Sequence, residues 1–230
     1  MRKALTIGTV ITFVAGTALW LAASVSAQGG GTVEVEVKYN GAPKVEKLKV
    51  NKDTEKCGTE ATIEEVVVGS NKGLANAVAS APGAKGSKAT AKAVLDQHGC
   101  KFVPHVVVMQ PGEIDIKNSD DILHNLHTYS SANPSINKAQ PKFKKVMTEK
   151  LEKPEFVKVT CDVHSWMRGW VAVVPGVAAV TDNNGVAKLE NVPAGKQKIE
   201  VWHETLGKQE KDVDVKAGAV TKVSFEMKGK

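Results

Sequence analysis

The sequence predicts an all-β fold, because short runs of alternating apolar and polar residues are separated by turn residues. The clearest run is Thr32–Lys38, in which valines alternate with polar side chains, as in a strand with one buried face. Turn-forming pairs such as Asn40-Gly41 and Pro111-Gly112 interrupt the runs. Many short strands at this spacing are typical of a β-sandwich.

Further strands are expected in order along the chain, each followed by turn residues. They cover residues 46–50, 62–68, 102–109, 113–117, 156–161, 169–174, 197–203, 211–215 and 219–226. No amphipathic helix of useful length is predicted, and residues 141–152 are expected to hold a helical turn or two at most.

Two stretches are predicted to be loops. Residues 80–93 are small, polar and basic, which is typical of an exposed segment. Residues 131–154 are rich in lysine and proline and hold few apolar side chains. Two interpretations of this second stretch stay open: a solvated insertion, and a docking surface for an acidic redox partner.

The N-terminus has the pattern of a secretory signal. Arg2 and Lys3 precede the uncharged apolar residues 4–23, and small residues up to Ala27 offer a cleavage site. We therefore expect residues 1–27 to be a signal peptide and the mature protein to be periplasmic or extracellular. The alternative is an uncleaved anchor, since the apolar run is just long enough to span a bilayer. Contact with a membrane is expected only through this segment.

The mature chain is mildly basic. Loss of Arg2 and Lys3 lowers the formal net charge from +6 by two, to +4. An excess of this size is compatible with acidic protein surfaces but does not indicate nucleic-acid binding, and no basic stripe with interleaved aromatic residues supports that class.

The three cysteines of the chain are an odd number for an exported protein. Cys57 and Cys100 both lie beside glycine in turn-like sequence, and we predict that they form a disulfide. Cys161 is then left without a cysteine partner, inside a segment rich in metal-binding side chains.

The composition changes near Pro175. Residues 178–226 contain Thr-Asp-x-x-Gly and Asn-Val-Pro-Ala-Gly followed by a strand, and this pattern resembles the carboxypeptidase regulatory-like family of small β-sandwiches. The resemblance implies a second β-unit over residues 176–230 and says nothing about chemistry. Because so short a segment is thin for an independent core, the strands within 32–50 are expected to complete it.

The strongest chemical signal is the motif Cys161-x2-His164-x2-Met167. Thiolate, imidazole and thioether are soft or borderline ligands, a mixture that suits copper in both of its oxidation states. A tight turn that leaves a strand can direct all three side chains at one point, whereas an extended strand would alternate them between its faces. The motif therefore predicts a mononuclear copper site at the rim of a sandwich.

A second histidine is expected to come from His124, which is followed by Asn125 and preceded by an Asn-x-Asp turn. Here the sequence resembles the cupredoxins, the blue-copper proteins such as plastocyanin and amicyanin. The resemblance implies a Greek-key sandwich within residues 28–175, with 80–93 and 131–154 as loops. It also implies a type-1-like copper ion held by His124, Cys161, His164 and, axially, Met167. Asn125 would cross-link the two ligand segments, and Trp166 would shield the ion from water.

Other interpretations of these residues remain. Cys161 could form an intermolecular disulfide, zinc could use Cys161 with the histidines, and a Cys–His nucleophile has the required residue types. His105 and His127 are candidates for an additional copper position. His98 is expected in a turn, and His203 is expected to be structural.

The favoured function is one-electron transfer to a redox partner such as a cytochrome, which lysines at 142, 144, 145, 150 and 153 would steer. The alternatives are copper storage, delivery or sensing, and an extracellular scaffold in which the metal loop is not essential. An enzyme is not expected, because multicopper catalysis uses His-x-His pairs and the sequence has none.

Overall fold

The structure, a computed structural model, describes residues 29–84 and 92–229. The predicted signal peptide and residues 85–91 of the predicted loop lie outside the described residues. Within the two ranges, no helix has the length and apolar character needed to cross a membrane.

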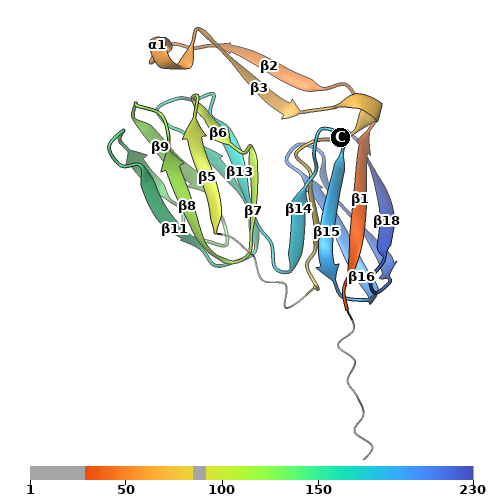
Figure 1. The fold of residues 1–230 in the computed structure, drawn as a ribbon. Helices are drawn as coiled ribbons and strands as arrows, with labels where there is room; N and C mark the ends of the chain where they lie inside the picture. The colour runs from red at the N-terminus through yellow and green to blue at the C-terminus, as the bar shows by residue number, and fades with distance from the viewer. Residues whose placement is uncertain (1–28, 85–91, 230) are drawn as a thin grey trace, which may run out of the picture.

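The regular structure of the described chain is almost all strand, so the predicted all-β class is confirmed, and the strands form two β-sandwiches that lie side by side (Figure 1). The elements are β1 (Gly31–Tyr39), β2 (Lys44–Lys49), α1 (Thr54–Cys57), β3 (Glu60–Val66), a 3-10 turn (Ser70–Lys72), β4 (Val78–Ala81), β5 (Ala93–His98), β6 (Lys101–Val103), β7 (Val106–Met109), β8 (Gly112–Asn118), β9 (His124–Tyr129), β10 (Asn137–Gln140), β11 (Val146–Leu151), β12 (Glu155–Thr160), β13 (Arg168–Val173), β14 (Val177–Val180), β15 (Val186–Val192), β16 (Gly195–His203), β17 (Gly207–Val215) and β18 (Val220–Met227).

The first sandwich packs the sheet β10-β9-β12-β13-β7 against the sheet β11-β8-β5-β6. Alternate residues of the strands, such as Ile114 and Ile116 of β8 and Val157 and Val159 of β12, meet in one buried core. Each of these side chains stabilises the fold by about 1.5–3 kcal/mol through removal of apolar surface from water. The core extends into the loop that joins β12 to β13, because Cys161, Trp166 and Met167 of this loop belong to it.

The second sandwich is made from both ends of the chain. Its sheets are β15-β1-β18 and β14-β4-β16-β17, with β1 parallel to β18. The segment 176–230 therefore takes two strands, β1 and β4, from within residues 28–175, and the boundary expected from sequence is corrected. Of the strands expected within 32–50, β1 pairs with the C-terminal segment, whereas β2 pairs with β3 instead.

Strands β2 and β3 and the short helix α1 between them form a covering ribbon, residues 44–66, that lies across one end of both sandwiches (Figure 1). At the α1 end, the predicted disulfide between Cys57 and Cys100 is present and ties the ribbon to the first sandwich. At the β3 end, the Thr205 hydroxyl donates a hydrogen bond to the Glu65 carbonyl at 3.2 Å, which ties it to the second.

The prediction that residues 131–154 form a loop is wrong, because they contain β10 and β11, which pair with β9 and β8. The expectation of a helical turn within 141–152 is wrong for the same reason. Lys138 of β10 makes an ion pair with Glu149 of β11, with 2.7 Å between Lys138 Nζ and Glu149 Oε1. The Glu149 side chain is buried. The inward-facing carboxylate is paired and hydrogen-bonded, which makes its burial tolerable.

Two other boundaries differ from the sequence analysis. The predicted loop 80–93 is shorter, since β4 includes residues 80 and 81 and β5 begins at Ala93. The predicted strand 102–109 is two strands, β6 and β7, because Pro104 between them has no N–H to donate to a ladder.

The two sandwiches pack together through aromatic side chains. The Phe156 ring stacks on Trp202 with centroids 4.1 Å apart, and Trp170 meets Trp202 edge-on at 5.0 Å. Val78, Val106, Ala172 and Val174 complete this buried contact. The contact includes strands of both halves, so it fixes the second sandwich relative to the first.

We predict that acid destabilises the second sandwich through His203. Burial lowers the pKa of this imidazole to about 4, against an ordinary value of 6.5. Above pH 6.5 both folded and unfolded chains hold it neutral, and below that value protonation favours the unfolded chain. Its contribution to the unfolding free energy is therefore expected to fall by about 2 kcal/mol between roughly pH 7 and pH 5. Urea unfolding of the metal-free protein measures this change.

A His203→Asn variant is the control, since an amide oxygen can accept the hydrogen bond that the Thr205 amide donates to His203 Nδ1 at 3.2 Å. Its stability should depend less steeply on pH over the same interval. Equal slopes for the two proteins would contradict the prediction.

Candidate metal centre

The Cys-His-Met motif occupies the loop between two paired strands. Thr160, the last residue of β12, pairs with Arg168, the first residue of β13, so residues 161–167 close a hairpin. The Met167 amide donates a hydrogen bond to the His164 carbonyl at 2.9 Å, which tightens this ligand loop into a turn. The turn brings side chains from several positions of the loop to one side, as the spacing of the motif requires.

His124 lies next to the ligand loop because its strand is a neighbour of β12. It is the first residue of β9, and β9 pairs with β12 through His127 and Thr160. The backbone N–H of Asn125 donates a hydrogen bond to the Cys161 sulfur at 3.3 Å, directly across this strand pair. Two segments that are distant in sequence thus meet at one end of the first sandwich.

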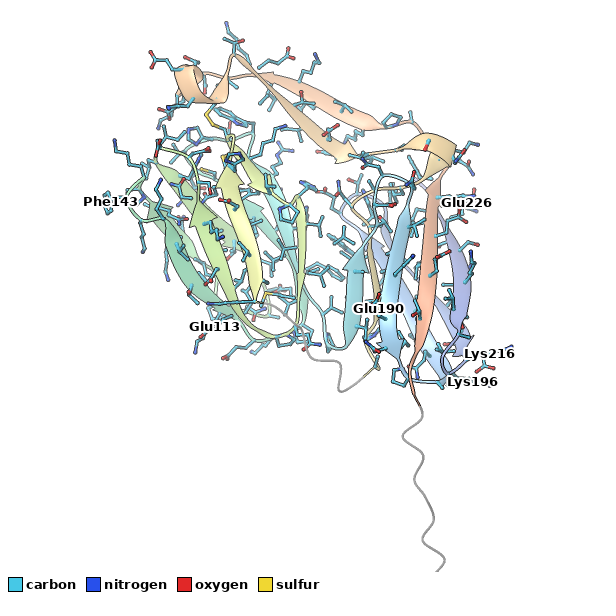
Figure 2. The ribbon with its side chains drawn as sticks, viewed as in Figure 1. Glu113, Phe143, Glu190, Lys196, Lys216 and Glu226 are labelled. Carbon is cyan, nitrogen blue, oxygen red and sulfur yellow. A yellow bond between two sulfur atoms is a disulfide. The ribbon has the colours of Figure 1, made fainter. Side chains whose placement is uncertain are left out.

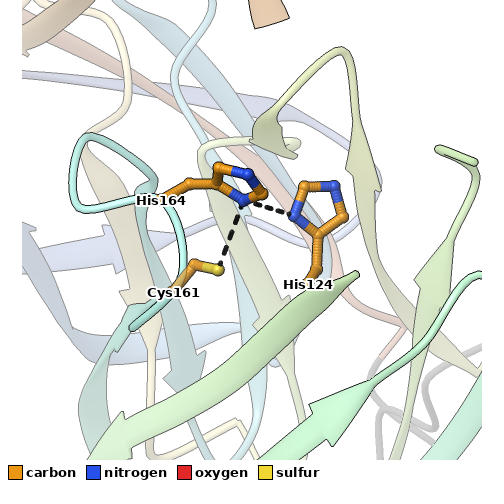
Figure 3. Close-up of side chains that lie close together, drawn as sticks. All are labelled: His124, Cys161 and His164. Atoms are coloured by element: carbon orange, nitrogen blue, oxygen red, sulfur yellow. Dashed lines mark hydrogen bonds between the residues drawn. The ribbon is translucent and has the colours of Figure 1, made fainter. Parts of the chain in front are cut away.

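His124, Cys161 and His164 form a buried cluster (Figure 3). Their donor atoms all lie within 4.8 Å of one another. The two Nδ1 atoms are 3.0 Å apart, and the Cys161 sulfur is 3.8 Å from His164 Nδ1. Both imidazoles are fully buried, and Cys161 is a free thiol that is buried with them. Met167 is buried in the same core cluster as Cys161.

The outer nitrogen of each imidazole contacts a carboxylate. His124 Nε2 is 2.8 Å from Asp120 Oδ2, and His164 Nε2 is 2.9 Å from Asp53 Oδ2. Each carboxylate oxygen is placed to accept a hydrogen bond from Nε2, and an imidazole with its single proton on Nε2 has a free lone pair on Nδ1. The two rings are therefore held in the tautomer that a metal ligand needs.

This arrangement fits a metal ion. Two lone pairs that face each other at 3.0 Å repel unless a cation or a shared proton lies between them. Metal–nitrogen bonds of about 2.0 Å and metal–sulfur bonds of about 2.3 Å can reach one common point from atoms this close. Two imidazoles and a thiolate suit zinc as well as copper, and a thioether as a further ligand would favour copper.

Burial sets the protonation of the metal-free centre. It raises the pKa of the Cys161 thiol and lowers the pKa of His124. Burial alone would raise the pKa of Asp120, but hydrogen bonds from the Cys100 amide, from His124 and from the Gly99 amide lower it overall. The cluster therefore holds a neutral thiol and a neutral His124 imidazole beside an ionised carboxylate, and a metal must displace the thiol proton to bind sulfur.

Asn125 and Trp166 lie where they support the ligand loop. Asn125 Oδ1 accepts a hydrogen bond from the Asp162 amide at 3.1 Å, which links β9 to the loop. The Trp166 ring lies 5.2 Å from the His164 ring, and its Nε1 donates to the Cys100 carbonyl at 3.2 Å. Both side chains thus link the loop to neighbouring segments of the first sandwich.

No protein-family model and no curated protein matches the chain. Among solved structures, it is similar to a copper-containing nitrite reductase (NirK) from Thermus scotoductus SA-01, with 20% identity and a TM-score of 0.32 over 41% of this chain and 25% of that one. It is also similar to an oxidized amicyanin mutant, with 19% identity and a TM-score of 0.33 over 41% of this chain and 97% of that one. A third is a purple cupredoxin from Nitrosopumilus maritimus, with 18% identity and a TM-score of 0.31 over 36% of this chain and 99% of that one. The chain thus spans a quarter of the nitrite reductase and nearly all of the two smaller proteins.

The two additional metal candidates lie outside the cluster. His127 Nδ1 is 2.9 Å from Asp162 Oδ1, and its ring stacks on Tyr129. Three residues along a strand bring a side chain to the opposite face, so His127 cannot join His124. His105 Nε2 contacts the carboxylate of Glu204, a residue of the second sandwich. The two rings thus have separate partners, and the structure does not bring His105 and His127 together.

The sequence analysis missed the two carboxylates. Asp120 lies in the Asn-x-Asp turn that was noted before His124, and its i,i+4 spacing to His124 was a usable signal. Asp53 is 111 residues from His164 and lies in a segment without any recognisable motif. Its role depends on the position of the covering ribbon, which the sequence did not predict.

Proposed function

We propose that this is an exported mononuclear copper protein that transfers single electrons. The observation that supports it is the convergence of His124 and His164 Nδ1 with the Cys161 sulfur in a buried cluster, with Met167 in the same core. Copper in such a donor set supplies a one-electron couple whose potential depends on the axial ligand and on the surroundings of the sulfur.

The chain holds the proposed ligands rigidly and keeps them buried from water. The ligand loop is closed by a hairpin, the Asn125 amide holds the sulfur, and the carboxylates hold both imidazoles. A fixed donor set changes little between oxidation states, which is what fast electron exchange requires. The four proposed ligands are almost fully buried, so substrate has no open position, and we propose a carrier and not an enzyme.

Spectroscopy of the copper-loaded mature protein tests this function. We expect an intense thiolate-to-copper absorption in the visible region and an electron spin resonance spectrum of one Cu(II) ion per chain. A colourless Cu(II) complex, or a protein that binds zinc and no copper, would overturn the proposal.

Storage, delivery or sensing of copper is the second candidate. Complete burial of both imidazoles favours the carrier, because rapid transfer to an acceptor needs ligands that the acceptor can reach. The Cu(I) exchange rate separates the two functions, since a delivery protein should release Cu(I) within the time of mixing. The third candidate is an extracellular scaffold in which the ligand loop is not essential. In that case, replacement of Cys161 should leave the scaffold function intact.

Export to the periplasm or the cell surface agrees with two features. The N-terminal sequence has the pattern of a signal peptide, and the Cys57–Cys100 disulfide is a bond that persists in oxidising compartments.

The redox partner is proposed to dock at a basic loop, residues 141–145, between β10 and β11. Phe143 is 82% exposed, and Lys142, Lys144 and Lys145 surround it. The loop adjoins the centre, because Gln140 pairs with His124 in the sheet and Lys145 Nζ lies 3.4 Å from the Asp120 carbonyl. An exposed aromatic ring within a basic patch suits an acidic redox protein such as a cytochrome.

Small charged oxidants test this surface without the natural partner. In a Lys142→Glu/Lys144→Glu variant, oxidation of the reduced protein by hexacyanoferrate(III) should slow by about tenfold at low ionic strength. The difference should shrink as salt rises, because the Debye length falls to about 10 Å at 0.1 M. Stopped-flow absorption at the copper band measures both rates.

The matched control is Lys196→Glu/Lys216→Glu, which makes the same change in net charge. These lysines lie at the far end of the second sandwich from Phe143 (Figure 2). Equal slowing in the two variants would show that net charge alone acts and would remove the basic loop as the docking surface.

A further inference from the structure

The covering ribbon packs directly on the ligand loop. Val50, Ala61 and Ile63 of the ribbon belong to the same buried core cluster as Trp166 and Met167. In Figure 1 the ribbon lies over the end of the first sandwich to which α1 is tied. The ribbon is thus part of the packed structure around the candidate metal centre.

Asp53 is the ribbon residue that reaches a ligand. It precedes α1 at the N-cap position, where an aspartate ordinarily accepts a hydrogen bond from its own helix. Here the side chain makes no capping bond, and Oδ2 instead lies 2.9 Å from His164 Nε2. The backbone of Asp53 is left-handed, with φ of 49°, a conformation that non-glycine residues rarely adopt. The local structure is therefore unusual at the residue that contacts the imidazole.

The disulfide joins the two carboxylates into one framework. The Cys57 amide donates to the Asp53 carbonyl at 2.9 Å, and Cys57 is bonded to Cys100. The Cys100 amide in turn donates to Asp120 Oδ2 at 2.9 Å, and this same oxygen contacts His124. One covalent bond thus connects the partners of both imidazoles.

We propose that Asp53 is a positioning residue of the metal centre. It accepts the Nε2 proton of His164, keeps Nδ1 free for the metal, and covers the outer edge of the ring. The centre is then built from three segments of the chain: the ribbon, the start of β9 and the ligand loop. The role in copper binding rests on the proposed function, whereas the tautomer of His164 does not.

The test begins with the metal-free protein. Imidazole nitrogen-15 NMR of the wild type should show His164 with its proton on Nε2, and Asp53→Ala should show a mixture of tautomers. Copper affinity of Asp53→Ala, measured by competition with a chelator, should fall by about 10- to 100-fold. Asp53→Glu, which keeps a carboxylate, should recover part of this loss.

The matched control is Glu55→Ala, which removes the same charge from α1 two residues further on. It should leave both the tautomer and the affinity unchanged. Circular dichroism confirms folding of each variant, and Asp53→Leu, which keeps about the size of the side chain but removes both acceptor oxygens, replaces Asp53→Ala if that variant unfolds.

Two results would overturn the proposal: a wild-type His164 that is protonated on Nδ1, or Asp53 variants that match Glu55→Ala in both measurements. If the wild type has the expected tautomer, which Asp53→Ala disturbs, but binds no copper, the proposed function fails and the positioning role of Asp53 stands.

Discussion

A Cys161→Ser variant is expected to lose the intense visible absorption completely and to bind Cu(II) more than about a hundredfold more weakly. Loss of a residue that only supports a ligand already costs about 10- to 100-fold in affinity, and Cys161 is proposed as the strongest donor itself. Its sulfur is buried, free, and 3.8 Å from His164 Nδ1. A hydroxyl at this position does not ionise near neutral pH and cannot supply the thiolate charge that Cu(II) requires.

Titration with copper, followed by visible absorption and by chelator competition, measures the effect. Met167→Leu is the contrasting variant, because a weak axial ligand tunes the potential and is not needed for the thiolate band. It should keep the colour and shift the reduction potential. A Cys161→Ser protein with an unchanged absorption or affinity would show that the ion is not bound at this sulfur.

Removal of the Cys57–Cys100 disulfide is expected to lower the unfolding free energy by about 3–4 kcal/mol. The bond closes a segment of 43 residues, and a cross-link over this length restricts the unfolded chain strongly. The closed segment contains β3 of the covering ribbon, β4 and β5, and the bond itself holds the α1 end of the ribbon, so its loss releases that end. Faster amide hydrogen exchange is therefore expected in residues 53–58 than in β8 or β12.

Urea unfolding of the metal-free Cys57→Ser/Cys100→Ser protein measures the loss, and metal-free Cys161→Ser serves as the control for replacing cysteine with serine. Because that control leaves the cross-link intact, it should stay clearly more stable than the double variant. A loss under about 1 kcal/mol would contradict the prediction and would mean that the ribbon is held by its apolar contacts alone.

Three of the proposed ligands could be predicted from the sequence because they lie close together along the chain. Cys161, His164 and Met167 lie within one hairpin loop, and the turn that brings them together is short. His124 required a resemblance to place it, but β9 and β12 are neighbouring strands, so the pairing follows once the sandwich is assumed. The disulfide followed from the odd number of cysteines and the chemistry around Cys161.

The elements that sequence could not provide depend on pairing between distant segments. In β11 the inward-facing Glu149 interrupts the apolar alternation, and only its ion pair with Lys138 makes the position acceptable in a buried strand. Asp53 reaches His164 only because the ribbon folds back over the first sandwich. Neither contact has a periodic signature, so both required the folded chain.

The parallel pairing of β1 with β18 has a consequence for the order of folding. Thr32 pairs with Val220, so the second sandwich cannot close until nearly the whole polypeptide has been synthesised. The first sandwich is complete by Val173 and can form earlier, because nearby contacts close faster than remote ones. Until then β1 would remain unpaired while the first sandwich assembles, and its unpaired backbone and row of valines would be exposed and open to aggregation.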